Sequence, residues 1–221
     1  MRQTPIHDFH NPEVLELIPQ TAARVIEIGC SSGALAREFR KGSPGIYWIG
    51  MEIDASYAEL AARYCDETMV ADVEKCSPEF YESQRATDCW IFSDVLEHLK
   101  DPWSVLRKIR EVIPANGSIV ACVPNAQHWT VIAKLALGDF RYEDMGLFDR
   151  THLRWFTRMT LVELFETQGF RVVEGTPRIS QEPHPAVLQF VTELAKNFGA
   201  DPVVTGNDIV ASQYVVRAIP V

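Results

Sequence analysis

RVIEIGCSSG, residues 24–33, joins a short apolar run to a turn that contains two glycines. The run predicts a buried strand from Arg24 to Gly29, and Gly33 opens a helix. Glycines permit a tight turn and let a ligand approach the backbone, and the N–H groups at the start of the helix can hold an anion. Because the same turn also occurs as a plain strand-to-helix connection, its function depends on what surrounds it.

Apolar runs alternate with helical patterns along the rest of the chain. Strands are expected at residues 46–51, up to 70, and at 88–93, 118–123, 170–174 and 209–218. Helices are expected over residues 1–20, 55–64, after the Asp101-Pro102 cap, and over 160–168 and 186–198. Strands that alternate with helices are typical of an α/β fold with a doubly wound, mostly parallel sheet. We predict a single domain over residues 1–221.

Residues 124–156 do not fit the compact pattern, because a connection after a strand usually takes two to six residues. An insertion at the carboxyl end of a parallel strand is where a doubly wound sheet builds its ligand site. We interpret the segment as a substrate-side cap, with a merely structural excursion as the alternative. Its aromatic residues are expected to form a small core of their own: Trp129, Phe140, Phe148, Trp155 and Phe156.

Composition restricts the classes of function. The chain has 221 residues, and 30 acidic against 21 basic side chains give a net charge of −9, which disfavours general nucleic-acid binding. There is no apolar run long enough to cross a membrane and no signal-peptide pattern, so a cytoplasmic protein is expected. The five cysteines are scattered and never form a C-x-x-C pair, so neither disulfides nor a zinc site is expected.

Acidic residues follow the second and third strands. Glu52 stands where nucleotide-binding sheets place a carboxylate for the ribose hydroxyls, and Asp54 is a rival two residues later. Asp72 can accept from an adenine amino group, while the side chain of Ile53 or Val73 covers a face of the ring. Acids at the tips of successive strands together favour a nucleotide-type ligand.

With these motifs the sequence resembles the class I S-adenosylmethionine-dependent methyltransferases. The resemblance covers residues 20–175 and is carried by VIEIGCSSG, GMEID, VADVE and the stretch from residue 88 to residue 125. The chain is most similar to bacterial methyltransferase-domain proteins with DVLEHLxDPW and GLxDRTHLRxFT, often linked with polysaccharide or glycosyl-transfer pathways, and more distantly to ubiquinone O-methyltransferases. Here these motifs read DVLEHLKDPW and GLFDRTHLRWFT.

The resemblance implies a Rossmann-like, seven-stranded sheet with the last strand antiparallel, and S-adenosylmethionine bound across the tips of strands one to four. It implies that Glu27, Gly29 and Gly33 form the turn under the methionine part, and that Ser93 lies beside the sulfonium. Ser31 stands where many relatives have a glycine. The full set of predicted cofactor-binding residues is Glu27, Gly29, Cys30, Ser31, Gly33, Glu52, Ile53, Asp72, Val73 and Ser93.

A hydroxyl acceptor gains from a base, and histidine suits that role near neutral pH. His152, in the cap, is the favoured catalytic residue, with His98 and His128 in reserve, and Asp149 could orient the ring of His152. For His98 a packing role is an equal alternative. A divalent metal held by Asp, Glu and His from these segments has no support from ligand spacing, so no metal site is predicted.

Arg150, Arg154 and Arg158 recur every four residues and would share one face if this stretch were helical. Guanidinium groups suit phosphate or carboxylate, so Arg150 and Arg154 are predicted to bind an anionic acceptor, against the alternative of a solvated cluster. We therefore expect an enzyme that O-methylates a small molecule such as a sugar or nucleotide sugar, acting as a monomer or homodimer. A nicotinamide-dependent oxidoreductase and a catalytically inactive cofactor-binding partner subunit are the alternatives.

Overall fold

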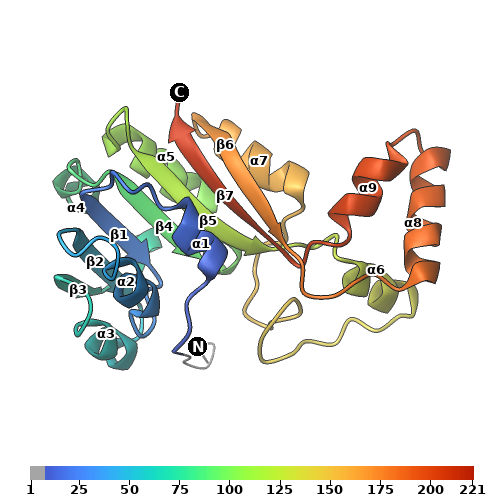
Figure 1. Ribbon diagram of the computed structural model, residues 1–221, viewed down its shortest axis with the longest axis horizontal. Helices are drawn as coiled ribbons and strands as arrows, with labels where there is room; N and C mark the ends of the chain where they lie inside the picture. The colour runs from blue at the N-terminus through green and yellow to red at the C-terminus, as the bar shows by residue number, and fades with distance from the viewer. Residues whose placement is uncertain (1–7) are drawn as a thin grey trace.

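A computed structural model describes residues 8–221 (Figure 1). Its seven-stranded sheet has the order β3-β2-β1-β4-β5-β7-β6. The first five strands pair in parallel, and β7 is antiparallel to both β5 and β6. The predicted sheet is therefore confirmed. The strands are β1 Arg24–Ile28, β2 Tyr47–Glu52, β3 Glu67–Val70, β4 Cys89–Ser93, β5 Ser118–Pro124, β6 Phe170–Arg178 and β7 Gln213–Pro220.

Helices cover both faces of the sheet, which makes the fold doubly wound (Figure 1). On one face α1 (Pro12–Leu17) and α2 (Ala34–Phe39) bury apolar side chains against β1 and β5. On the other face α5 (Pro102–Val112) and α7 (Arg158–Glu166) pack on the central strands. The remaining helices beside the sheet are α3 (Ala55–Ala61), α4 (Pro78–Ser83) and the 3-10 turns η1 (Val73–Lys75) and η2 (Leu96–His98).

The cap is larger than the sequence predicted, because a second insertion joins it. The segment between β5 and α7 contributes α6 (Trp129–Ala136), and the segment between β6 and β7 contributes α8 (Pro185–Asn197) and α9 (Pro202–Asp208). These three helices pack together at the right of Figure 1, away from the helices that cover the sheet. The predicted strand at 209–218 begins only at Gln213, because the apolar residues before it pack at the end of α9.

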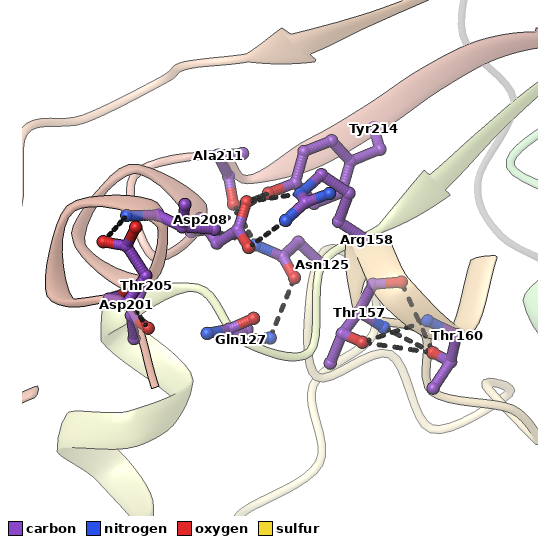
Figure 2. Close-up of polar contacts among 11 residues, drawn as sticks. Asn125, Gln127, Thr157, Arg158, Thr160, Asp201, Thr205, Asp208, Ala211 and Tyr214 are labelled. Carbon is purple, nitrogen blue, oxygen red and sulfur yellow. Dashed lines mark hydrogen bonds and ion pairs between the residues drawn. The ribbon is translucent and has the colours of Figure 1, made fainter. Parts of the chain in front are cut away.

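A buried polar network fastens this cap to the sheet (Figure 2). Asn125, just after β5, donates from its side-chain amide to the carbonyl oxygens of Asp208 and Ala211, both at 2.8 Å. The Asp208 carboxylate in turn accepts two bonds from the guanidinium of Arg158, at 2.7 and 3.0 Å, and one from the Tyr214 hydroxyl. Because the polar groups of this network have partners, it holds the base of the cap in a single arrangement against the sheet.

No helix among residues 8–221 is both long enough and apolar enough to cross a membrane.

Candidate functional site

The turn after β1 has a left-handed backbone at three positions. Gly29 has φ 72°, Ser31 φ 47° and Gly33 φ 77°. At Gly33 a Cβ atom would stand 3.0 Å from the Cα atom of Ala61 in α3, so the glycine allows the turn to approach that helix. Ser31 adopts the unusual conformation without being glycine, which is uncommon and characteristic of functional sites.

Glu52 ties this turn to the tip of β2. Its carboxylate accepts hydrogen bonds from the backbone N–H groups of Ser31 at 2.9 Å, Ile53 at 2.8 Å and Asp54 at 3.2 Å. The residue is only 3% exposed. Backbone amides thus hold the buried Glu52 carboxylate in one orientation. The carboxylate lies between the ends of β1 and β2, which the sequence predicts to bind one ligand.

The other predicted residues on this side divide into exposed and buried groups. Ile53 is 61% exposed and available to cover a ring, whereas Val73 is 3% exposed and packs in the core beneath the sheet edge. Asp72 caps η1 and pairs with Lys75 at 2.8 Å. Asp54, the rival of Glu52, caps α3 through the N–H groups of Ser56 and Tyr57, and the Ser56 hydroxyl lowers its pKa.

Glu27 and Cys30 lie beneath the turn. The Glu27 carboxyl accepts a hydrogen bond from the indole N–H of Trp48 at 3.1 Å, and burial raises its pKa from 4.5 to about 8. The Cys30 side chain faces Gly50, where an added Cβ would be 2.8 Å from the sulfur. Burial also raises the pKa of the Cys30 thiol, so this side chain is an inert packing group.

The end of β4 lies directly against the turn. A Cβ on Gly29 would stand 2.6 Å from Cγ2 of Val95, which leaves room for glycine only. At the end of β4, the Ser93 hydroxyl donates to the Asp94 carboxylate at 3.3 Å. Asp94 has φ 56° and is, after Ser31, a second non-glycine residue with a left-handed backbone at this sheet edge, and Gln213 donates to its carboxylate.

Two residues beyond Val95, the chain meets the cap. The carbonyl oxygen of Glu97 accepts from the backbone N–H groups of Leu153 at 2.8 Å and Arg154 at 2.9 Å. These bonds bring the imidazole rings of His98 and His152 into an edge-to-face contact, with ring centroids 4.8 Å apart. Two of the three predicted catalytic histidines therefore lie together, beside the predicted cofactor turn.

Three further groups surround the histidine pair. The ring of His98 bonds through Nδ1 to the hydroxyl and the carbonyl oxygen of Thr151, at 3.0 and 3.2 Å. That hydroxyl donates to Asp149 at 2.6 Å, so Asp149 acts on His98 through Thr151. Toward His152, the ring it was expected to orient, the Asp149 carboxylate contributes a charge that raises the pKa. The pKa of His152 is lowered to about 4, first by burial and then by the charge of His98.

Glu97 itself was not among the predicted residues. Its side chain is 1% exposed, and neither carboxylate oxygen has a hydrogen-bond partner among the residues that the structure describes. Burial and then the charge of Asp94 hold its pKa well above the ordinary value. Residue type and spacing do not single it out, because an acid in DVLEHL is equally compatible with an exposed helix face.

His128 and the arginines differ from expectation. His128 is 2% exposed and stands at the start of α6, bonded to the Thr130 hydroxyl at 2.8 Å, where its contacts are those of a packing residue. The three arginines do not share a helix face, because Thr157 caps α7 and the helix begins only at Arg158. Arg150 pairs with Asp144, Arg154 donates to the carbonyl of Lys100, and Arg158 holds Asp208.

The aromatic residues of the cap form a smaller cluster than predicted. Phe140, Phe148 and Trp155 contact one another, with centroids 5.4 to 6.2 Å apart. Phe156 instead joins the main core, and Trp129 lies against His128. Because His152 contacts Trp155 edge to face, the cluster holds the predicted catalytic ring in place.

Comparisons with known proteins agree with this geometry. The family model described as a methyltransferase domain matches residues 6–175. A ubiquinone biosynthesis O-methyltransferase from Histophilus somni is 29% identical over 125 residues, which is 51% of this chain. The match spans about half the length of that curated relative, 51%.

Solved structures share the fold at low identity. An S-adenosylmethionine-dependent methyltransferase from Mesorhizobium loti has a TM-score of 0.61 and 16% identity, over 94% of this chain and 96% of that one. Mitomycin 7-O-methyltransferase has a TM-score of 0.59 and 17% identity, over 95% of this chain and 52% of that one. An O-methyltransferase of neocarzinostatin biosynthesis, solved with S-adenosylmethionine and a naphthoic acid, has a TM-score of 0.58 and 13% identity, over 94% and 52%.

Proposed function

The chain belongs to the methyltransferase-domain family, and from that premise we propose that it transfers the methyl group of S-adenosylmethionine to a hydroxyl oxygen of a small molecule. The observation that carries the proposal is the bond from the Ser31 N–H to the Glu52 carboxylate, which joins the β1 turn and the tip of β2 into one binding edge. When bound, S-adenosylmethionine supplies an electrophilic methyl group on a sulfonium, whose sulfur leaves as a neutral thioether.

The residues at this edge fit the cofactor in chemistry. Glu52 offers a buried carboxylate, held by three backbone N–H groups, to the two hydroxyls of a ribose. Ile53 offers exposed apolar surface next to it, and Asp72 at the tip of β3 offers a second acceptor for an adenine amino group. Gly29 and Gly33 let the backbone pass close beneath the methionine part, with Ser93 at the end of β4 on its other side.

Catalysis then needs an oriented acceptor that can lose its proton. His152 is the proposed proton acceptor and His98 its neighbour, because the pair lies just past Val95, which touches the cofactor turn. With its pKa lowered to about 4, His152 is neutral at pH 7 and carries a free lone pair.

The acceptor class rests on two supports. Relatives named as O-methyltransferases favour oxygen as the accepting atom, and the resemblance to proteins of polysaccharide pathways favours a sugar or nucleotide sugar. For an anionic group on the acceptor the structure offers Arg150, whose ion pair with Asp144 is 2.9 Å long and half exposed. Such an exposed pair costs little to exchange for a ligand anion.

The test is methyl transfer itself. Purified protein is incubated with S-adenosylmethionine labelled in its methyl group and a panel of sugars, sugar acids and nucleotide sugars, and the products are analysed by mass spectrometry. Transfer to oxygen in at least one compound supports the proposal. Tight binding of S-adenosylhomocysteine with no transfer to any hydroxyl compound would instead favour an inactive partner subunit.

A further inference from the structure

We propose that Glu97, His98 and His152 form a binding site for a divalent first-row transition-metal ion beside the methyl acceptor. Each of the three residues offers one ligand atom, and these atoms all lie within 4.8 Å of one another. Two imidazoles and one carboxylate are the protein ligands of one class of catalytic zinc sites, which keep further positions open. The inference rests on the proposed function for what the ion does there, and on the geometry alone for its binding.

A hydrogen bond determines which nitrogen of the His98 imidazole is available. A carbonyl oxygen accepts only, so the contact from His98 Nδ1 to the carbonyl of Thr151 requires a proton on Nδ1 and leaves the lone pair on Nε2. The ring of His98 is thus anchored at one nitrogen, the arrangement found in metal-binding histidines. The ring of His152 is held by its edge-to-face contacts with His98 and Trp155.

The carboxylate of Glu97 supplies the second, independent observation. A buried carboxyl that lacks hydrogen bonds is costly, and native proteins rarely keep one without a role. Both oxygens of Glu97 are in that condition within residues 8–221, while its side chain lies among the two imidazoles. A bound cation would satisfy both oxygens at once.

The backbone holds the ligands together without the ion. Glu97 and His98 are adjacent in η2, and the Glu97 carbonyl bonds to Leu153 and Arg154, the residues that follow His152. Behind His98, the Thr151 hydroxyl donates to Asp149 at 2.6 Å, a second layer that orients the ring. Ligand atoms about 2.1 Å from a tetrahedral ion stand about 3.4 Å apart. The ligand atoms here lie within 4.8 Å of one another, so side-chain rotations that move them by little more than about 1 Å bring them to that separation.

The donor set selects the class of ion. Imidazole nitrogens suit zinc, copper, iron and nickel, whereas calcium, magnesium and manganese prefer oxygen ligands. A cation here lies just past Val95 and the cofactor turn, where a hydroxyl acceptor must approach. With an ion bound, His152 would act as its ligand in place of accepting the proton. The hydroxyl held beside the ion would release its proton to solvent, its oxygen would bond to the methyl carbon, and the carbon–sulfur bond would break with its electron pair left on sulfur.

Cobalt is the probe, because its visible absorption reports coordination by nitrogen and oxygen. The full chain, stripped of metals with a chelator and dialysed, is titrated with Co²⁺ in a calorimeter and a spectrophotometer. We expect one ion per chain, and a loss of affinity in Glu97→Gln and His152→Ala of more than about 100-fold, the upper range for changes one layer further out. His184→Asn is the matched control, because His184 caps α8 and Asn retains the cap.

Circular dichroism of each variant tests whether it is folded. If Glu97→Gln does not fold, the Co²⁺ affinity of His152→Ala decides the question. Co²⁺ that binds Glu97→Gln and His152→Ala as tightly as the parent, or that does not bind the parent, would overturn the site. S-adenosylhomocysteine is titrated separately into the same preparations. If S-adenosylhomocysteine binds and Co²⁺ does not, the metal site is wrong and the proposed function stands. If Co²⁺ binds and no methyl group is transferred, the metal site stands and the proposed function is wrong.

Discussion

Two buried glutamates at one edge of the sheet are held in opposite ways. Glu52, 3% exposed at the tip of β2, accepts three backbone N–H bonds from residues next to it or in the β1 turn. Glu97, 1% exposed after β4, accepts none from the part of the chain that the structure describes. Backbone amides orient the first carboxylate before a ligand arrives, and the second gains its partners only from something bound. We infer that the β1–β2 half binds cofactor and the β4–cap half acts on the acceptor.

The largest expected effect is on rate, in the acceptor half. Changing His152 to Ala should lower kcat by about 10²- to 10⁴-fold, the usual range for loss of proton-transfer help, because the ring lies against His98 at the acceptor position. Steady-state kinetics measure kcat, and calorimetry measures affinity for S-adenosylhomocysteine. Unchanged kcat would break the division between the halves, and equal losses in rate and cofactor affinity would make His152 a structural residue of the cap.

A third buried glutamate, Glu27, accepts a hydrogen bond from the indole N–H of Trp48, and burial raises its pKa from 4.5 to about 8. A raised folded-state pKa contributes stability that is complete below pH 4.5 and is lost as pH rises to about 8. Glu27→Gln keeps the acceptor for Trp48 without the titration. Its unfolding free energy relative to the parent should therefore rise across that window, with a slope approaching about 1.4 kcal/mol per pH unit.

Chemical denaturation of both proteins at several pH values measures this difference. A difference that stays constant between pH 4.5 and pH 8 would show that Glu27 is ionised in the folded protein throughout.

Substitutions in the β1–β2 half should change the affinity for the cofactor. Glu52→Ala removes a charged acceptor for the ribose hydroxyls, which costs about 1.5 to 3 kcal/mol in the binding of S-adenosylhomocysteine. Asp54→Asn is the control, because Asp54 caps α3 and Asn caps equally well, so affinity should stay at the parent value. Calorimetry that finds the loss in Asp54→Asn and not in Glu52→Ala would move the ribose site to Asp54.

The smallest effect concerns the acceptor charge. Arg150→Ala should raise KM for an anionic acceptor by a few-fold, about 1 kcal/mol or less, because this exposed guanidinium already pairs with Asp144. KM for a neutral sugar measured alongside should not change. A KM that is the same for both classes of acceptor in parent and variant would remove Arg150 from recognition.

The same two halves explain what the sequence could predict. Strand tips and the turn after β1 are local features, so Gly29, Glu52 and Asp72 could be placed from spacing and residue type, and α5 began at its expected Asp101 cap. Families of such sheets repeat this geometry, which is why the order and direction of strands also followed from the resemblance.

The acceptor half depends on contacts between distant segments. Glu97 and His152 are brought together by the backbone bonds of Glu97 to Leu153 and Arg154, which no spacing reveals. The arginine pattern failed for a local reason, because Thr157 starts α7 too late for Arg150 and Arg154 to share its face. The second insertion, with α8 and α9, was missed as part of the cap because its contact with α6 exists only in the folded chain.

The central claim is that the β1–β2 edge binds the methyl donor, and direct calorimetric titration tests it. S-adenosylhomocysteine and NAD are titrated separately into the full chain at pH 7.5. We predict binding of one S-adenosylhomocysteine per chain, displaced by S-adenosylmethionine, and no heat of binding with NAD. Binding of NAD in its place, or no binding of S-adenosylhomocysteine at millimolar concentration, would contradict the account.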